Sequence, residues 1–415
     1  ADAAPPVEKP HLRLAGCRNV TDVLSDLKAQ VAANAKGIAL LHELIREHGR
    51  RAVLSYMGHV QDNAAACVRS MLREYAARIR ADGEATLDNN GGGGGGLTVR
   101  AADQMDDGSP IELQLTIDEA RGLCRFDFGG TGAQVHGNWN APSAVTTAAV
   151  IYCLRLLVGR EIPLNSGCLE PVTIDIPAGS MLSPAADAAV CAGNVLTSQR
   201  VTDVILKAFG AAAASQGCMN NFTFGDAGFG YYETIAGGSG AGPSWEGTSA
   251  VQCHMTNTRM TDVEIMEKRY PVVVDTFALR RGSGGAGARG GGCGVVREVT
   301  FLRDGITASL LTERRAVAPF GLAGGGPGAR GRNTLLRRPA APGAPRAEIA
   351  LGIKCKFAVG RGDTVRISTP GGGGHGAGDG GGGGGGRKRK GVEGAAGGGG
   401  RRTASTALSA NDVEF

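Results

Sequence analysis

The polar stretch Gly193-Asn-Val-Leu-Thr-Ser-Gln-Arg200 opens a segment that is otherwise apolar and helical in pattern. A second polar block, His254-Met-Thr-Asn-Thr-Arg259, lies downstream, and residues 231–244, rich in glycine and hydroxyl groups, lie between the two. A polar group buried without a partner costs about 1–3 kcal/mol, so buried polar groups are hydrogen-bonded or functional. We therefore expect these three blocks to form the binding or catalytic region.

The first block begins a helix that we predict over residues 195–209. Asn194 precedes this helix, so unpaired backbone amides and the positive end of the helix dipole would point outward there. Together with Ser198, Gln199 and Arg200, they would form a cradle for a carboxylate or a phosphate. The alternative is an ordinary N-cap with a polar first turn. Our hypothesis assigns Asn194, Ser198, Gln199 and Arg200 to substrate binding.

The second block would form a strand, with His254 on one face and Asn257 and Arg259 on the other. Asn257 and Arg259 would then supply a second contact to the same anion. His254 can act as an acid or a base near neutral pH, and Glu233 is the nearest other candidate for that role. A lone histidine is more often structural. We predict Glu233 and His254 as catalytic residues and no metal site.

Composition narrows the class of protein. The chain has 415 residues, 42% of them hydrophobic, and 69 glycines, which indicates a globular protein with glycine-rich insertions. The sequence has no run of about 18 apolar residues, so it predicts no membrane span, and it has no recognisable secretory signal. Ten cysteines lie at least fifteen residues apart, which excludes CxxC zinc sites. We expect a cytosolic protein with reduced thiols, and the alanine at position 1 suggests a fragment or a processed product.

The N-terminal region, residues 17–85, is expected to form a helical hairpin that turns at Gly49. Its two helices would cover residues 21–48 and 51–80. Steps of three and four residues give the first helix a narrow apolar seam like that of a coiled coil. The seam consists of Leu24, Leu27, Val31, Ile38, Leu41 and Ile45. We predict that the two helices pack antiparallel along such seams.

Residues 97–370 are expected to form a mixed-sheet core with interspersed helices, which makes the fold class mixed α/β. One helix would run from Pro142 to Gly159. We predict strands at 111–117, 123–128, 172–176, 231–235, 272–274, 295–303, 306–311 and 364–368. Residues 88–96 are interpreted as a flexible insertion, and residues 371–415, rich in glycine and with a basic cluster, as disordered.

Two further patterns suggest phosphate or nucleic-acid binding less strongly. Asp127-Phe-Gly-Gly-Thr131 matches the phosphate loop of actin-like ATPases, but that loop joins two strands of a hairpin, and here the chain runs on toward a helix. A glycine-permitted turn is the better interpretation. Residues 280–338 contain eleven arginines, three acids and no lysine, which favours bidentate contacts over bulk charge. Because aromatic residues are not interleaved with the arginines, nucleic-acid binding is disfavoured.

Several segments carry a resemblance to one family. They read Met105-Asp-Asp-Gly-Ser-Pro110, Phe126-Asp-Phe-Gly-Gly-Thr-Gly132, Gly137-Asn-Trp-Asn-Ala-Pro142, Ile162-Pro-Leu-Asn-Ser-Gly-Cys168, the two polar blocks, and Leu311-Thr-Glu-Arg-Arg315. With these segments in order over about residues 17–376, the chain resembles the hydantoinase B/oxoprolinase family, and within it the C-terminal part of the eukaryotic 5-oxoprolinases. It departs from the family at Cys293, where aspartate is usual, and at His375, where an aromatic residue is usual.

The resemblance implies ATP-dependent opening of the 5-oxoproline lactam to glutamate, within the glutathione-linked γ-glutamyl cycle. A hydantoinase A-like half, in cis or in trans, is expected to bind ATP and a divalent metal, mainly outside this chain. The present chain would help to form the substrate site, would be inactive alone, and is expected to form a homo-oligomer. Two alternatives stay open: an N-methylhydantoinase-type or carboxylase-type B subunit, and a non-catalytic interaction remnant. Segments 105–110 and 162–168 favour 5-oxoprolinase.

Overall fold

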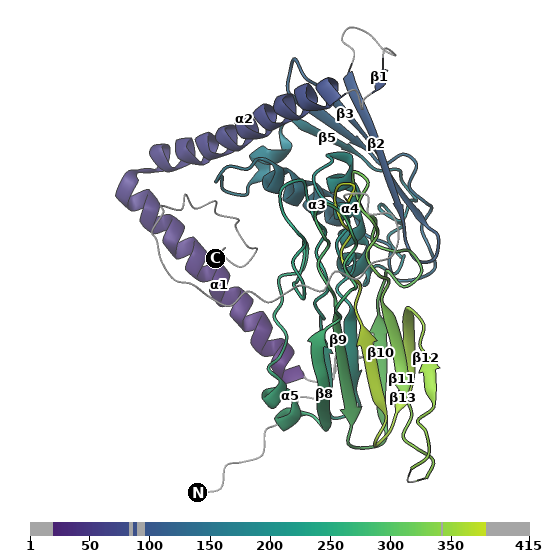
Figure 1. Cartoon of the computed structure of the whole chain (residues 1–415). Helices are drawn as coiled ribbons and strands as arrows, with labels where there is room; N and C mark the ends of the chain where they lie inside the picture. Colours follow the sequence, from purple (N-terminus) through teal and green to yellow (C-terminus); the bar gives the residue numbers. More distant parts are fainter. Residues whose placement is uncertain (1–19, 83–85, 89–95, 342, 379–415) are drawn as a thin grey trace, which may run out of the picture.

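The computed structural model describes residues 20–82, 86–88, 96–341 and 343–378, and it has the mixed α/β architecture that the sequence predicts (Figure 1). Two lobes lie one above the other, with one long helix across the top of the upper lobe and a second long helix running down beside them (Figure 1). The first lobe is built on one sheet with helices against it, and the second is built on two facing sheets. Across the described ranges, none of the helices combines the length and the apolarity that crossing a bilayer requires.

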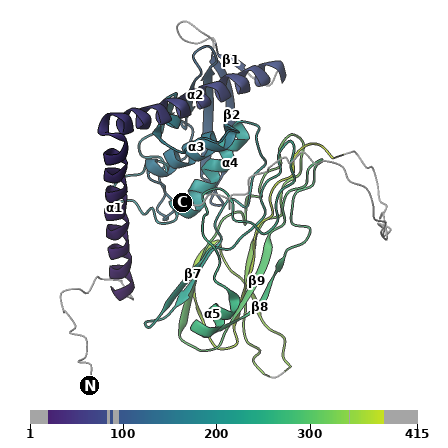
Figure 2. The same ribbon diagram turned by 90° about the vertical axis from the view of Figure 1, so that its left-hand side faces the viewer.

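The N-terminal helices α1 (Val20–His48) and α2 (Arg50–Asp82) form as predicted and meet at Gly49, whose φ is +81°. The predicted antiparallel packing is wrong, because the two helices diverge from this elbow (Figures 1 and 2). The second half of α2 packs into the first lobe, where Ala64, Val68 and Leu72 are fully buried. The apolar face of α2 is therefore taken by the core, and α1 has no buried residue.

The first lobe is a five-stranded sheet covered by helices. In spatial order the strands are β1 (Thr86–Asp88), β2 (Gly96–Gln104), β3 (Pro110–Asp118), β4 (Leu123–Asp127) and β5 (Val172–Asp175). Only the β4–β5 pair is parallel. The helices are α3 (Ser143–Leu157), the short η2 (Ser166–Leu169) and α4 (Ser198–Ala208). Most of the predicted insertion, residues 89–95, lies outside the described residues.

The second lobe is a pair of antiparallel sheets that enclose an aromatic core around Phe222, Phe224 and Phe301. One sheet contains β6 (Asn221–Gly225), β7 (Gly230–Glu233), β10 (Ile306–Leu311) and β13 (Lys354–Val359). The other contains β8 (Val272–Leu279), β9 (Val295–Phe301), β11 (Arg332–Leu336), β12 (Glu348–Ala350) and β14 (Thr364–Ser368). The short helix α5 (Val263–Arg269) packs beside β8. The sequence did not predict β1, β2, β6, β11, β12, β13, η2 or α5.

Glycine-rich segments join the two lobes through direct backbone contacts. The amides of Gly372, Gly373 and Gly374 donate hydrogen bonds of 2.8–2.9 Å to the carbonyls of Gly292, Ala214 and Gly326 respectively. A Cβ at Gly372 would lie 1.9 Å from the Ser239 carbonyl oxygen, so no larger residue fits there. The prediction of disorder is therefore wrong for the start of the 371–415 segment, where residues 371–374 are buried, and residues 379–415 lie outside the described residues.

Candidate active site

The three polar blocks meet between the lobes, as the sequence analysis expected. Gln199 Nε2 in α4 donates to the Cys253 carbonyl at 3.0 Å and to Thr256 Oγ1 at 2.8 Å. Gln252 Nε2 reaches the Thr234 carbonyl at 3.3 Å and so ties the loop after β7 to the same region. Residues more than 50 positions apart along the chain therefore form one polar surface.

The start of the first block is not the open anion cradle that we predicted. A π-helical turn, η3 (Gly193–Thr197), runs directly into α4, and the Ser198 amide donates to the Gly193 carbonyl. The Ser198 hydroxyl donates to the Asn194 carbonyl at 2.5 Å, and Ser198 is fully buried. A Cβ at Gly193 would lie 2.1 Å from the Asn140 carbonyl oxygen, so the turn is packed beneath a loop. Only Asn194 is exposed.

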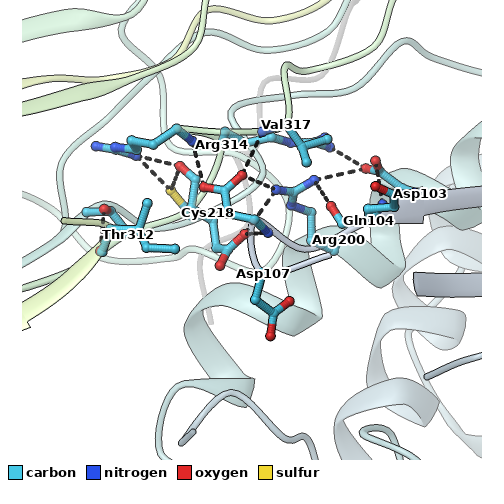
Figure 3. A network of polar contacts seen from close by, with 12 residues as sticks. Asp103, Gln104, Asp107, Arg200, Cys218, Thr312, Arg314 and Val317 are labelled. Carbon is cyan, nitrogen blue, oxygen red and sulfur yellow. Dashed lines mark hydrogen bonds and ion pairs between the residues drawn. The ribbon is translucent and has the colours of Figure 1, made fainter. Parts of the chain in front are cut away.

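Arg200 is also unavailable to a substrate, because carboxylates of the protein surround it (Figure 3). Its guanidinium lies 3.1 Å from Asp103, 3.1 Å from Glu313 and 3.7 Å from Asp106, and it donates to the Gln104 carbonyl at 2.8 Å. The side chain is fully buried. A role for Arg200 in binding a substrate carboxylate is therefore contradicted.

Around Arg200 lies a buried network of ion pairs. Three cations, Arg200, Arg314 and Lys354, pair with four anions, Asp103, Asp106, Asp203 and Glu313, and the Arg315 backbone amide donates to Asp106 at 2.6 Å. Burial alone would raise the pKa of Asp103, but Arg314 and Arg200 outweigh it and hold the pKa below its ordinary value. Since the network connects β2 and α4 with the strands of the second lobe, we interpret it as a clamp between the lobes.

Glu233, predicted as an acid–base residue, is part of a separate ion pair. Arg297 contacts both of its carboxylate oxygens, at 2.8 and 3.0 Å, and the Tyr231 hydroxyl donates to it at 2.8 Å. The Glu233 residue is 4% exposed. Both oxygens are therefore occupied inside the core of the second lobe, and this contradicts a catalytic role for Glu233.

His254 is the predicted catalytic residue that lies in a chemically suitable setting. The segment 254–259 is a loop rather than a strand, and His254 adopts a left-handed backbone conformation with φ of +52°. Its Nδ1 lies 3.3 Å from the Tyr152 hydroxyl, and its Nε2 lies 3.6 Å from Asp203 Oδ1. A non-glycine residue in this conformation is strained, and such strain is concentrated at functional sites.

Tyr152, His254 and Asp203 form a chain of groups that can hold and move a proton. Burial raises the pKa of Tyr152, so its hydroxyl stays protonated at neutral pH and can donate to Nδ1. Nε2 then carries the imidazole proton and faces Asp203. Asp203 is itself oriented by the Ser215 amide at 3.1 Å and by Arg314 at 2.6 Å. This arrangement matches an acid–base group with an orienting carboxylate.

Three buried polar atoms in this region have no hydrogen-bond partner, namely Gln199 Oε1, Gln252 Oε1 and His254 Nε2. An unpartnered buried polar atom calls for an explanation, and a bound ligand or water supplies one. Asn257 and Arg259, the remaining predicted binding residues, are exposed in the same loop, three and five positions after His254. The loop thus presents both a possible proton carrier and a possible anion contact.

The loop Asp127–Thr131 does not fit nucleotide phosphates. Asp127 Oδ1 accepts a hydrogen bond from the Gly129 amide at 2.8 Å, and the Arg125 guanidinium lies 3.5 Å from the same carboxylate. A Cβ at Gly130 would lie 2.1 Å from Glu112 Oε2, so a second carboxylate fills the space beside the glycine. The prediction of a simple turn is confirmed. Among the residues that the structure describes, no three His, Cys, Asp or Glu side chains are grouped as a metal site.

Tyr152 and Asp203 were not predicted from the sequence as site residues. Asp203 follows Gln199 by four residues, so it lies on the same helix face, and an acid on a buried face was a usable signal. Tyr152 carried no such signal, because a tyrosine in an apolar helix is ordinarily a core residue.

Comparison with known proteins agrees with the fold. The model of the hydantoinase B/oxoprolinase family matches residues 8–378. The chain is 55% identical to 5-oxoprolinase 1 of Arabidopsis thaliana over 87% of its own length, but it covers only 28% of that protein. It is 53% identical to 5-oxoprolinase of Dictyostelium discoideum over 86% of its own length and covers 27% of that protein. The crystal structure of the ATP-dependent caprolactamase from Pseudomonas jessenii superposes with a TM-score of 0.72 at 20% identity, covering 88% of this chain and 62% of that one. The chain belongs to the hydantoinase B/oxoprolinase family.

Proposed function

We propose that this chain is the hydantoinase B-like part of an ATP-dependent 5-oxoprolinase, which hydrolyses the lactam of 5-oxo-L-proline to L-glutamate. The two relatives named above, both called 5-oxoprolinases, support this substrate. Because they are more than three times longer than the matched region, the activity needs further parts. We place ATP and a divalent metal on a hydantoinase A-like half, and the whole enzyme in the cytosol as a homo-oligomer.

The observation that carries a catalytic role for this chain is the Tyr152–His254–Asp203 arrangement. Lactam hydrolysis is slow at neutral pH, and phosphorylation of the amide oxygen by ATP would activate the carbonyl carbon. Water would then add to that carbon, and the carbon–nitrogen bond would break as the ring nitrogen takes up a proton, which leaves the phosphoryl group on the released carboxyl as an acyl phosphate. A second water would hydrolyse this acyl phosphate to glutamate and inorganic phosphate. In our proposal the Tyr152 hydroxyl accepts a proton from the attacking water while it passes its own proton to His254. Later His254 returns a proton to Tyr152, and Tyr152 passes its proton to the ring nitrogen of the substrate. The Asp203 carboxylate, 3.6 Å from Nε2, favours the imidazole tautomer that carries its proton on that atom.

Exposed groups of the 254–259 loop would bind the substrate carboxylate. Arg259 can hold a carboxylate with two parallel hydrogen bonds, and Asn257 lies beside it. We retain these two residues, with Asn194, as proposed substrate contacts, and Gln199 as the residue that positions their loop. Replacing Arg259 with alanine in the assembled enzyme should raise KM at least tenfold with kcat little changed, since one charge-assisted contact contributes about 1.5–3 kcal/mol.

The test is steady-state glutamate formation by the chain assembled with its hydantoinase A-like half. His254→Gln and Asp203→Asn should lower kcat by about 100-fold or more with KM nearly unchanged, the usual size of a general acid–base effect. His59→Gln, on the exposed face of α2, is the matched control and should keep full activity. A His254→Gln enzyme with wild-type kcat and a lower melting temperature would make the arrangement structural. An assembled wild-type enzyme that opens other cyclic amides but not 5-oxoproline would overturn the substrate.

A further inference from the structure

Helix α1 carries an apolar seam whose central positions are exposed in the described chain, whereas Leu24 and Ile45 near its ends are half-buried. Its seam positions repeat every seven residues, with spacings of four and three, over four heptads. The positions designated a are Leu24, Val31, Ile38 and Ile45, and those designated d are Leu27, Asn34, Leu41 and His48. Exposure is 49% at Leu27, 68% at Val31 and 59% at Ile38, although these residues form the centre of the apolar stripe.

Most charges of α1 lie away from this seam. Asp22, Asp26, Lys36, Glu43 and Arg46 occupy outer positions of the heptads, while Lys28 flanks the seam. Two of the positions that flank the seam are apolar as well, namely Val23 at 37% and Leu44 at 47% exposure. This separation of apolar and charged faces is typical of a helix that packs against a partner, since helical stability in proteins comes mainly from burial of an apolar face.

We propose that the α1 seam binds α1 of a second copy of this chain in a parallel, two-stranded coiled coil. β-Branched residues at three of the four a positions and leucine at two d positions favour two strands. Asn34 lies in the middle of the seam. A single polar seam residue is tolerated when it meets its own counterpart, as it does when the two helices are parallel and in register.

The available area suits a dimer. Six exposed apolar side chains lie on or beside the seam and offer on the order of 500 Å² per helix, judged from their exposed fractions. They are Val23, Leu27, Val31, Ile38, Leu41 and Leu44, whereas the exposed Leu40 lies on the outer face. Two helices then bury on the order of 1,000 Å², the size at which specific interfaces begin. Parallel pairing also brings the two elbows to the same end, where Tyr56 is 71% and Met57 is 45% exposed and can add contacts. The proposal names the surface of the homo-oligomer and is independent of the catalytic activity.

Sedimentation equilibrium of the 415-residue chain tests this proposal. The wild type should have twice the monomer mass of 42.3 kDa at micromolar concentration. Val31→Asp combined with Ile38→Asp should raise the dimer dissociation constant at least 100-fold and leave the thermal unfolding of the core unchanged. Ala33→Asp, on the outer face, is the control and should remain dimeric. A monomeric wild type, or a dimer that survives the double substitution, overturns the proposal.

Cross-linking tests the orientation. Leu27→Cys should form a disulfide-linked dimer on mild oxidation. Residue 27 lies seven positions from the midpoint of α1, so only a parallel, in-register pair brings the two copies within the Cα separation of about 4.4–6.8 Å that a disulfide needs. Ala33→Cys, on the outer face, should cross-link no more than the wild type. A dimer in which Leu27→Cys does not cross-link excludes the parallel register. The seam would belong to the hydantoinase A-like half instead if the chain is monomeric alone and α1 becomes protected from solvent only when that half is added.

Discussion

The guanidinium of Arg200 contacts three carboxylates and a backbone carbonyl and has no exposure to solvent. Removing one partner of a buried ion network leaves the others unpaired, which costs about 3–5 kcal/mol. We therefore expect Arg200→Ala to lower the free energy of unfolding by about that amount, measured by urea denaturation. Arg259→Ala, at an exposed position, should change it by less than about 0.5 kcal/mol. Equal and small effects would show that the clamp contributes little.

Cys293 illustrates how backbone geometry sets the reactivity of one side chain. Burial alone would raise the pKa of its thiol, but hydrogen bonds from the amides of Gly284, Ser283 and Gly282 outweigh burial and hold the pKa below its ordinary value. Burial raises the pKa of Cys355, which is also partly exposed. Since the thiolate is the nucleophile, we expect Cys293 to react with iodoacetamide at least about threefold faster than Cys355 at pH 7.5. Peptide mass spectrometry measures both rates in one sample, and equal rates would contradict the prediction.

At the scale of elements, periodicity determined what could be predicted. The strands β3, β4 and β10 alternate cleanly between buried and more exposed residues, and the corresponding predictions, 111–117, 123–128 and 306–311, are confirmed. The strand β12 has no buried residue, so it left no alternating pattern to detect. The site was harder to predict for a different reason. Glu233 and Arg297 are 64 residues apart, and a sequence pattern does not show which buried charges pair across such a separation.

The glycine-rich segments that join the two lobes pack closely because they carry no side chains, and no periodic pattern in the sequence reveals this packing. A matched pair of glycine substitutions tests how tight it is. A Cβ at Gly372 would overlap the Ser239 carbonyl oxygen, whereas a Cβ at Gly58 in α2 would have no neighbour within 4 Å. We expect Gly372→Ala to destabilise the protein by about 3 kcal/mol or more, because the surrounding backbone must move. Gly58→Ala should stabilise it by about 0.5–1 kcal/mol through helix propensity. Thermal unfolding of the two variants provides the comparison, and similar shifts would argue against tight packing in these segments.

For the whole molecule, the candidate site depends on the docking of two lobes. Tyr152 and Asp203 lie on helices of the first lobe, while His254 lies on a loop that follows β7 of the second. The buried ion network holds the same two lobes together. The clamp and the possible proton relay share Asp203, which receives Arg314 on one oxygen and faces His254 with the other. Stability of the interface between the lobes and geometry of the site are therefore coupled through one carboxylate.

The last glycine-rich segment of the described chain contributes hydrogen bonds to this interface between the lobes. The effect of a C-terminal truncation on stability should therefore depend on whether it removes this segment. Residues 371–376 donate backbone hydrogen bonds to the carbonyls of Ala329, Gly292, Ala214, Gly326, Arg289 and Leu322, all outside the segment. At about 1 kcal/mol for each bond, their loss costs on the order of 5 kcal/mol. We expect a chain that ends after Pro370 to melt at least about 10 °C lower than the full chain, in differential scanning calorimetry. A chain that ends after Gly378 keeps every one of these bonds and should melt within about 2 °C of the full chain. Equal melting temperatures for the two truncations would show that the segment does not hold the lobes together.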